Sequence, residues 1–121
     1  YNVDVITCAA PNLREKPSNA FNTGDGKDAI KITDKDLLAI HEKQLRRILD
    51  VALSNKIETI VLGAFGCGAF MNNPNVVAQA SKNVVNEYLY AFKNIEFAVY
   101  CSPKDDTNYR IFDRVLKPYT K

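Results

Sequence analysis

The longest regular pattern of hydrophobic positions covers residues 34–55. Non-polar residues recur there every three or four positions, which places them on one face of an α-helix. Thr33, directly before this stretch, is a residue type that accepts hydrogen bonds from the free N–H groups at a helix start. The pattern therefore predicts an amphipathic helix whose buried face holds Leu38, His41, Leu45, Ile48, Leu49 and Ala52.

Three shorter stretches have the β-branched and aromatic composition that is typical of strands. They cover residues 3–7, 59–64 and 95–100. The second stretch is apolar at successive positions from Ile60 to Gly63, as in a strand with both faces buried. We therefore expect this strand to lie inside a sheet that is covered on both sides.

Two further helices are predicted after the second and third strands. Asn73 can cap the first of them and Pro74 fits its first turn. The last helix covers residues 107–116, with Asp106 as its cap. The inward positions are predicted to be Val77, Ala80, Val84, Tyr88 and Phe92 in the first, and Tyr109, Phe112 and Leu116 in the second.

Strand and helix alternate three times in this order, which favours an α/β fold with a mostly parallel sheet in a single domain, residues 1–121. Three strands are few for such a sheet, so we expect exposed edges able to pair with another copy or a second chain. The chain opens at Tyr1 in a strand-like run, and we expect a fragment that lacks the first strands of its domain. The polar connection 8–32, with Pro11, Pro17, Gly24 and Gly26, is long enough to predict either a functional loop or a disordered segment.

Composition narrows the class of protein further. The chain is 46% hydrophobic and 25% charged, as expected of one globular domain. Its net charge of +2 is spread along the chain, which argues against nucleic acid or a membrane as a direct partner. No apolar run could cross a bilayer, and three cysteines without CxxC spacing fit a reducing compartment. We therefore expect a cytoplasmic protein.

The most informative stretch is VLGAFGCGAFMNNP, residues 61–74, where a strand ends in closely spaced glycines before a helix. Gly63, Gly66 and Gly68 permit positive φ and let backbone N–H groups converge near the positive end of that helix. This geometry suits a phosphate, although close packing in a tight turn accounts for the motif equally well. The spacing matches neither GxGxxG nor the GK[ST] of a nucleotide-triphosphate loop.

Together with VDVITCAAPN, residues 3–12, this stretch resembles the microbial-type poly(ADP-ribose) glycohydrolases, a branch of the macrodomain superfamily. The resemblance covers nearly the whole chain, including FAVYCSPKDDTNYRIF near its end. It implies a three-layer α/β/α macrodomain fold that binds ADP-ribose or an ADP-ribosylated macromolecule. We expect no cofactor and no metal in this chain. It also implies that residues 101–103 lie towards the adenosine side, and that the ligand is held by Gly66, Cys67, Gly68, Ala69, Phe70, Pro11 and Asn12.

The family's catalytic loop is a glycine run that ends in Gln-Glu-Glu and supplies the general acid for glycoside cleavage. The present sequence contains no Gly-Gly-Gly and no Glu-Glu pair, so we predict no catalytic residue in this chain. The complete protein is expected to hydrolyse ADP-ribose glycosidic bonds. The alternative is a binding protein instead of an enzyme, a reader that binds ADP-ribose without cleaving it.

Other chemistry has less support in the sequence. Cys8 and Arg14 have the CxxxxxR spacing of cysteine phosphatases, but Pro11 removes an amide from that loop. Cys67 near a helix start could be a nucleophile, although a small residue filling a tight loop is the simpler interpretation. His41, the single histidine, is expected to be packed or hydrogen-bonded rather than a metal ligand. Zinc bound by Cys8, Cys67 and Cys101 lacks the paired spacing of zinc sites.

Overall fold

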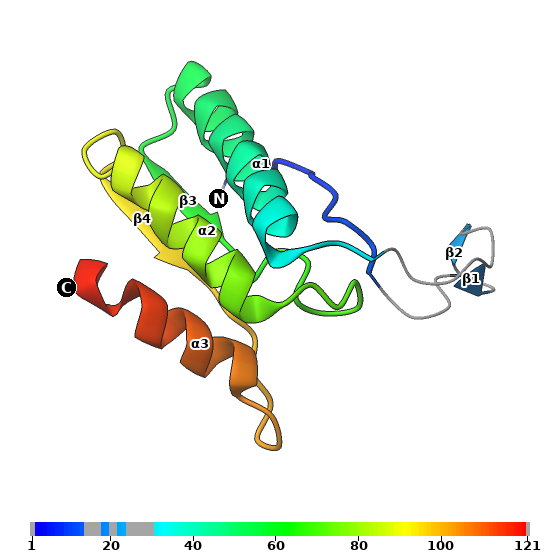
Figure 1. Ribbon diagram of the computed structural model, residues 1–121. Coiled ribbons are helices and arrows are strands. Elements are labelled where there is room, and N and C mark those ends of the chain that lie inside the picture. The colour runs from blue at the N-terminus through cyan, green and yellow to red at the C-terminus, as the bar shows by residue number, and fades with distance from the viewer. Residues whose placement is uncertain (1, 14–17, 20–21, 24–30, 121) are drawn as a thin grey trace.

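Helices and short strands alternate along most of the chain (Figure 1). The computed structural model describes residues 2–13, 18–19, 22–23 and 31–120. Its elements in chain order are β1 (Ser18–Asn19), β2 (Asn22–Thr23), α1 (Asp34–Ser54), β3 (Thr59–Leu62), α2 (Pro74–Glu87), β4 (Asn94–Phe97), α3 (Thr107–Leu116) and the 3₁₀ helix η1 (Lys117–Tyr119).

The starts of the two long helices are capped as the sequence predicts. Thr33 Oγ1 accepts a hydrogen bond from the Asp36 N–H at 3.2 Å. Asn73 Oδ1 accepts one from the Asn75 N–H at 3.0 Å, and Pro74 occupies the first turn of α2. These side chains satisfy N–H groups that have no partner inside the helix.

Asp106 occupies the N-cap position of α3 as predicted, but the capping hydrogen bond comes from its neighbour. Asp106 makes no capping hydrogen bond, whereas Asp105 Oδ1 accepts from the Thr107 N–H at 3.0 Å. The Asp106 carboxylate instead accepts from Arg110 Nε at 2.7 Å, one helical turn further on. The ion pair with Arg110 engages the Asp106 carboxylate, so the preceding residue, Asp105, makes the capping hydrogen bond.

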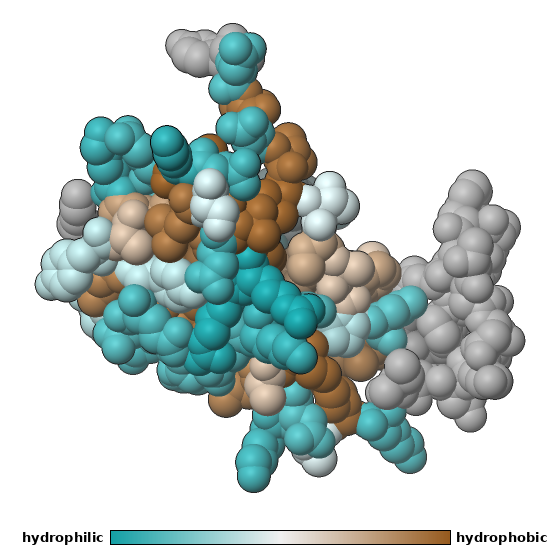
Figure 2. Space-filling model, turned by 90° about the horizontal axis from the view of Figure 1, so that it is seen from above, coloured by the Kyte–Doolittle hydropathy of each residue, from teal (hydrophilic) through white to brown (hydrophobic). Residues whose placement is uncertain are grey.

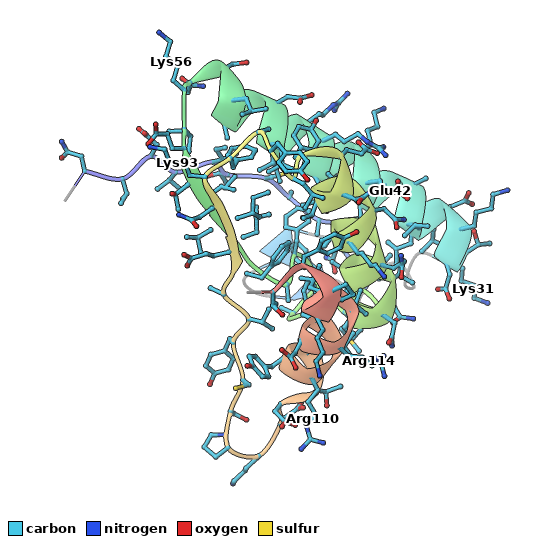
Figure 3. The ribbon with its side chains drawn as sticks, turned by 90° about the vertical axis from the view of Figure 1, so that its left-hand side faces the viewer. Lys31, Glu42, Lys56, Lys93, Arg110 and Arg114 are labelled. Atoms are coloured by element: carbon cyan, nitrogen blue, oxygen red, sulfur yellow. The ribbon has the colours of Figure 1, made fainter. Side chains whose placement is uncertain are left out.

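The sheet consists of β3 and β4, which pair in parallel from Thr59 beside Asn94 to Leu62 beside Phe97. Its inward side chains pack against α1, α2 and α3, so all three helices lie on one face, as Figure 3 shows. The predicted α/β class with a parallel sheet is confirmed. Three layers were expected. The described elements form two, the β3–β4 sheet and the layer of helices on one of its faces.

The opposite face of this sheet is uncovered among the described residues, contrary to the prediction for β3. Along β3 buried and exposed positions alternate, and Val61 is 61% exposed. Hydrophobic residues that reach the surface can be seen in brown among the hydrophilic ones in Figure 2. An apolar sequence allows both faces of a strand to be buried. Whether both faces are buried depends on which elements pack against the sheet.

The predicted strand at residues 3–7 is absent from the structure, and this prediction is wrong. The segment joins no ladder, and Val3 and Val5 are 79% and 81% exposed. It lines a groove of about 1200 Å³ together with β3 and the end of α1. A short β-branched run becomes a strand only when a neighbour takes up its N–H and C=O groups.

Two hydrophobic clusters form the core, and α2 contributes to both. One joins α1, α2 and β3 through residues that include Leu49, Ile60 and Val84. The other joins α2 to α3 through Val77 and Phe112, with the Phe112 ring centroid 5.9 Å from that of Phe97. Helix α2, into which the glycine stretch leads, is therefore held between α1 and α3.

The predicted buried faces need three corrections. In α1 the fully buried position of the first turn is Leu37, and Leu38 and Ile48 are half-buried. Helix α2 ends at Glu87, so half-buried Tyr88 and buried Phe92 lie beyond it. Tyr109 is 49% exposed rather than inward, and the buried residues of α3 are Phe112 and Leu116.

The predicted connection 8–32 contains the antiparallel pair β1 and β2 in its described part. Pro17, Gly24 and Gly26 of the predicted loop lie outside the described residues. No described helix combines the length and the apolar character that a membrane crossing needs.

Candidate functional site

The backbone between β3 and α2 depends on one of its three glycines. Gly66 has a φ of +77°, and a Cβ added there would lie 2.6 Å from Ala10 Cβ and 2.9 Å from Asn72 Nδ2. Gly63 and Gly68 have no such close neighbour and no positive φ, contrary to the expectation for all three. Gly66 therefore brings the glycine loop, residues 63–72, close to the segment around Ala10.

The glycine loop uses its own carbonyl groups to hold its shape. The hydrogen bonds are Cys67 N–H to Ala64 O at 3.0 Å, Met71 N–H to Gly68 O at 2.9 Å and Asn72 N–H to Gly66 O at 2.9 Å. Within the described part of the chain, the N–H groups of Gly68 and Ala69 donate to no acceptor, and both residues are exposed. The loop therefore offers free donors shortly before the positive end of α2.

Residues 9–13, here called the proline segment, lie against this loop. The Leu13 N–H donates to the Phe70 carbonyl at 2.9 Å. Asn72 Nδ2 donates to the carbonyl of Pro11 at 2.7 Å and to that of Phe70 at 3.3 Å. The structure thus brings the predicted ligand-binding residues from both parts of the sequence together, with Pro11, Asn12 and Phe70 half-buried.

Helix α1 holds the other side of the proline segment and loop. His41 is fully buried, and its Nε2 lies 2.8 Å from Asn72 Oδ1. Its ring meets Phe65 edge-on, with centroids 5.6 Å apart, and Gln44 Nε2 donates to Ala9 O at 3.2 Å. Burial lowers the pKa of His41, and the hydrogen bond with Asn72 opposes that shift only in part.

Sequence reasoning expected His41 to be packed or hydrogen-bonded, and the structure confirms this. It did not identify Asn72 as the partner, because 31 residues separate the two along the chain. The sequence did contain a signal that His41 has a partner. It is a single polar residue in the middle of a non-polar helix face, and a buried polar group requires a hydrogen bond.

Cys67 lies inside the loop, and burial raises the pKa of its thiol to about 12. Its Sγ donates a long contact to Phe65 O at 3.8 Å, and its carbonyl accepts from Asn108 Nδ2 at 3.3 Å. A thiol with this pKa is protonated at neutral pH, and a nucleophile must be the thiolate. The surroundings of Cys67 thus suit a packing role.

The remaining candidates are not brought together by any described contact. Cys8 and Cys101 are exposed, and Arg14 lies outside the described residues. Among the described side chains, no group of three His, Cys, Asp or Glu residues could hold a metal ion. No described hydrogen bond joins residues 101–103 to the glycine loop.

Comparison with known proteins identifies relatives by structure. No protein-family model matches the sequence, and no curated protein matches it. Among solved structures, poly(ADP-ribose) glycohydrolase of Deinococcus radiodurans in complex with ADP-ribose is similar over 71% of this chain and 35% of that enzyme, with 31% identity and a TM-score of 0.65. Its apo form is similar over 69% and 35%, with 32% identity and a TM-score of 0.61.

A mutant of poly(ADP-ribose) glycohydrolase from Thermomonospora curvata has a TM-score of 0.65 over 69% of this chain and 33% of its own. At 24% identity, this match concerns the fold alone. The family resemblance inferred from the glycine loop and the proline segment is confirmed. The chain has a macrodomain-like α/β fold similar to that of the microbial poly(ADP-ribose) glycohydrolases, and it spans about a third of the length of the enzymes it matches.

Proposed function

We propose that this chain binds ADP-ribose through the glycine loop, with Gly66 to Phe70 around the diphosphate. The observation that carries the proposal is the pair of free, exposed N–H groups at Gly68 and Ala69. They precede α2, which has no acidic residue in its first turn to oppose an anion. Backbone donors beside a helix N-terminus suit phosphate oxygens.

The proline segment supplies the second wall of the proposed cleft. Pro11 and Asn12 are linked to the loop through the Leu13 and Asn72 hydrogen bonds, so the two walls have a fixed separation. In the proposed complex the Phe70 ring lies beside the distal ribose. The ADP-ribose complex of the similar Deinococcus radiodurans enzyme supports this choice of ligand.

Calorimetric titration of the 121-residue chain with ADP-ribose tests the proposal, with AMP and inorganic phosphate as comparisons. We expect saturable binding of ADP-ribose and weaker binding of the two smaller ligands, because each occupies only part of the cleft. Equal binding of phosphate and ADP-ribose would contradict recognition of the whole nucleotide. Absence of heat with all three ligands, repeated at a second temperature, would contradict the proposal for this chain.

For the complete protein we propose hydrolysis of ADP-ribose glycosidic bonds. The enzyme names of the similar structures support this, whereas the chain itself contains no Glu-Glu pair to supply an acid. Incubation with poly(ADP-ribose) distinguishes an enzyme, which releases ADP-ribose, from a reader, which only binds it. Binding without release of ADP-ribose is expected for the 121-residue chain, and release is expected once a segment carrying the catalytic glutamates is joined to it.

We also propose that the β3–β4 sheet pairs with another polypeptide or with a second copy. The sheet has only two strands in the described part of the chain, and Val61 is exposed on its uncovered face. Unpaired strand edges present N–H and C=O groups that readily extend a sheet.

A further inference from the structure

The side-chain amide of Asn72 links the proline segment, the glycine loop and α1, because its nitrogen and its oxygen make separate hydrogen bonds. Its Nδ2 donates to the carbonyls of Pro11 and Phe70, at 2.7 and 3.3 Å. Its Oδ1 lies 2.8 Å from His41 Nε2. Because two carbonyl groups require the NH₂ end on their side, Oδ1 must face the imidazole.

This arrangement fixes the protonation state of the histidine. An amide oxygen only accepts, so His41 Nε2 must carry the proton that it donates. Nδ1 is buried and has no hydrogen-bond partner among the described residues. A proton on Nδ1 would create a buried, unpaired N–H on a charged ring, so the neutral ring with Nε2–H is the favoured form.

The position of His41 adds a second constraint. It lies on the buried stripe of α1 between Leu37 and Leu45, with none of its surface exposed. Its edge-on contact with Phe65 restricts rotation of the ring. The helix therefore holds the Nε2–H at a fixed position, opposite the residue that joins the proline segment to the glycine loop.

From these contacts we propose that His41 is a positioning residue for ADP-ribose binding, which holds the Asn72 amide so that the proline segment and the glycine loop keep their separation. The inference rests on the proposed function, since it concerns the same cleft. Without the Nε2–H, the amide loses the donor that selects its orientation. A flipped amide would place Oδ1 against the Pro11 and Phe70 carbonyls, and the two walls would separate.

Three variants of the 121-residue chain test this. His41→Phe keeps an aromatic ring beside Phe65 but removes the donor. His41→Gln keeps an N–H donor that can reach Asn72 Oδ1. Leu49→Ala is the matched control, because Leu49 is fully buried on the same helix face and belongs to the core cluster that joins α1, α2 and β3.

The first readout is hydrogen exchange of the ligand-free protein, in which the Leu13 amide reports on the bond to Phe70 O. In His41→Phe we expect exchange at Leu13 to accelerate at least about tenfold relative to the core amide of Val84. Leu49→Ala should accelerate both amides together. Unchanged exchange at Leu13 in His41→Phe would overturn the positioning role.

The second readout is the dissociation constant of ADP-ribose, measured at a temperature where all variants are folded. We expect it to rise about tenfold in His41→Phe, to return to within about threefold of wild type in His41→Gln, and to stay unchanged in Leu49→Ala. An equal rise in Leu49→Ala would overturn the proposal, because general loss of stability would then explain it. If the wild-type chain does not bind ADP-ribose, the proposed function fails, and the exchange measurement still decides whether His41 holds the two walls together.

Discussion

His41 Nε2 and Asn72 Oδ1 lie 2.8 Å apart in the interior of the protein, although 31 residues separate them in the sequence. This hydrogen bond connects α1 to the last loop residue before the cap of α2. Through the other end of the Asn72 amide it reaches Pro11. The shape of the proposed ADP-ribose cleft therefore depends on a helix that contributes no residue to its predicted lining.

Gly68→Glu is expected to abolish ADP-ribose binding and leave the fold intact. A Cβ at position 68 would meet no atom within 4 Å, so the side chain can be added without a clash. Its carboxylate would then lie beside the free N–H groups and repel the diphosphate. Calorimetry and thermal unfolding check the two effects separately.

The matched control for this prediction is Gly68→Ala, which adds the Cβ without the charge. We expect it to bind ADP-ribose with an affinity close to that of wild type. Wild-type affinity in Gly68→Glu would show that the ligand binds elsewhere.

Gly66→Ala is expected to lower the free energy of unfolding by about 2 kcal/mol, because an L-residue at positive φ costs roughly 1–2 kcal/mol and the Cβ also clashes. The clashing atoms are Ala10 Cβ at 2.6 Å and the Asn72 amide. The substitution is therefore also expected to push the proline segment away from the glycine loop. Urea unfolding measures the loss, and Gly63→Ala, where the nearest neighbour is Ala98 O at 3.8 Å, is the control.

Stability is expected to fall as the pH drops below 6.5 because of His41. Its pKa in the folded protein is lowered from the usual 6.5 by burial, so the unfolded chain takes up a proton first. Between 6.5 and the lower folded pKa, the free energy of unfolding decreases by up to about 1.4 kcal/mol per pH unit. Above 6.5 this residue contributes no pH dependence.

Urea unfolding of wild type and His41→Gln at pH 7.5, 6.0 and 5.0 measures this contribution. His41→Gln has no group that titrates at this position, so its stability should vary less over the same range. Identical slopes in the two proteins would show that His41 is protonated equally in the folded and unfolded states.

Lys56→Gly is expected to stabilise the protein by about 1 kcal/mol, because glycine removes the cost of a side chain at positive φ. Lys56 has a φ of 58° at the end of α1, where its N–H donates to Leu53 O and the Ile57 N–H donates to Ala52 O. This pair of bonds is the Schellman ending of a helix, which favours glycine at that position. Figure 3 shows the Lys56 side chain pointing away from the molecule, so little contact is lost.

Thermal unfolding checks this prediction, with Lys56→Ala as the control. Alanine removes the same charge and keeps the Cβ, so the melting temperature should stay near that of wild type. A gain as large in Lys56→Ala as in Lys56→Gly would assign the effect to charge instead of backbone strain.

Val61→Lys is expected to weaken self-association of the chain. Val61 is 61% exposed on the uncovered face of the β3–β4 sheet, and lysine is a residue that discourages pairing of exposed strands. Sedimentation velocity over a range of concentrations should show reversible association of wild type and a more monomeric variant. A wild-type chain that sediments as a monomer at every concentration would contradict the proposed pairing.

Local patterns in the sequence determined the helices of this protein. The 3.6-residue repeat of α1, the caps Thr33 and Asn73, and Pro74 act within a few residues, so they can be read without knowing the fold. The glycine loop and the family resemblance were recognisable for the same reason. The assignment of ADP-ribose to particular residues stays a prediction.

Only the tertiary structure decided what depends on contacts distant in sequence. Residues 3–7 lack a strand because no described segment pairs with them, and Val61 is exposed because α1, α2 and α3 lie on the other face of the sheet. Gly66 proved to be the constrained glycine because Ala10 lies against it. The partner of His41 likewise became known only when the chain brought Asn72 to it, since hydrogen bonds and packing act over a few ångströms in space regardless of separation along the chain.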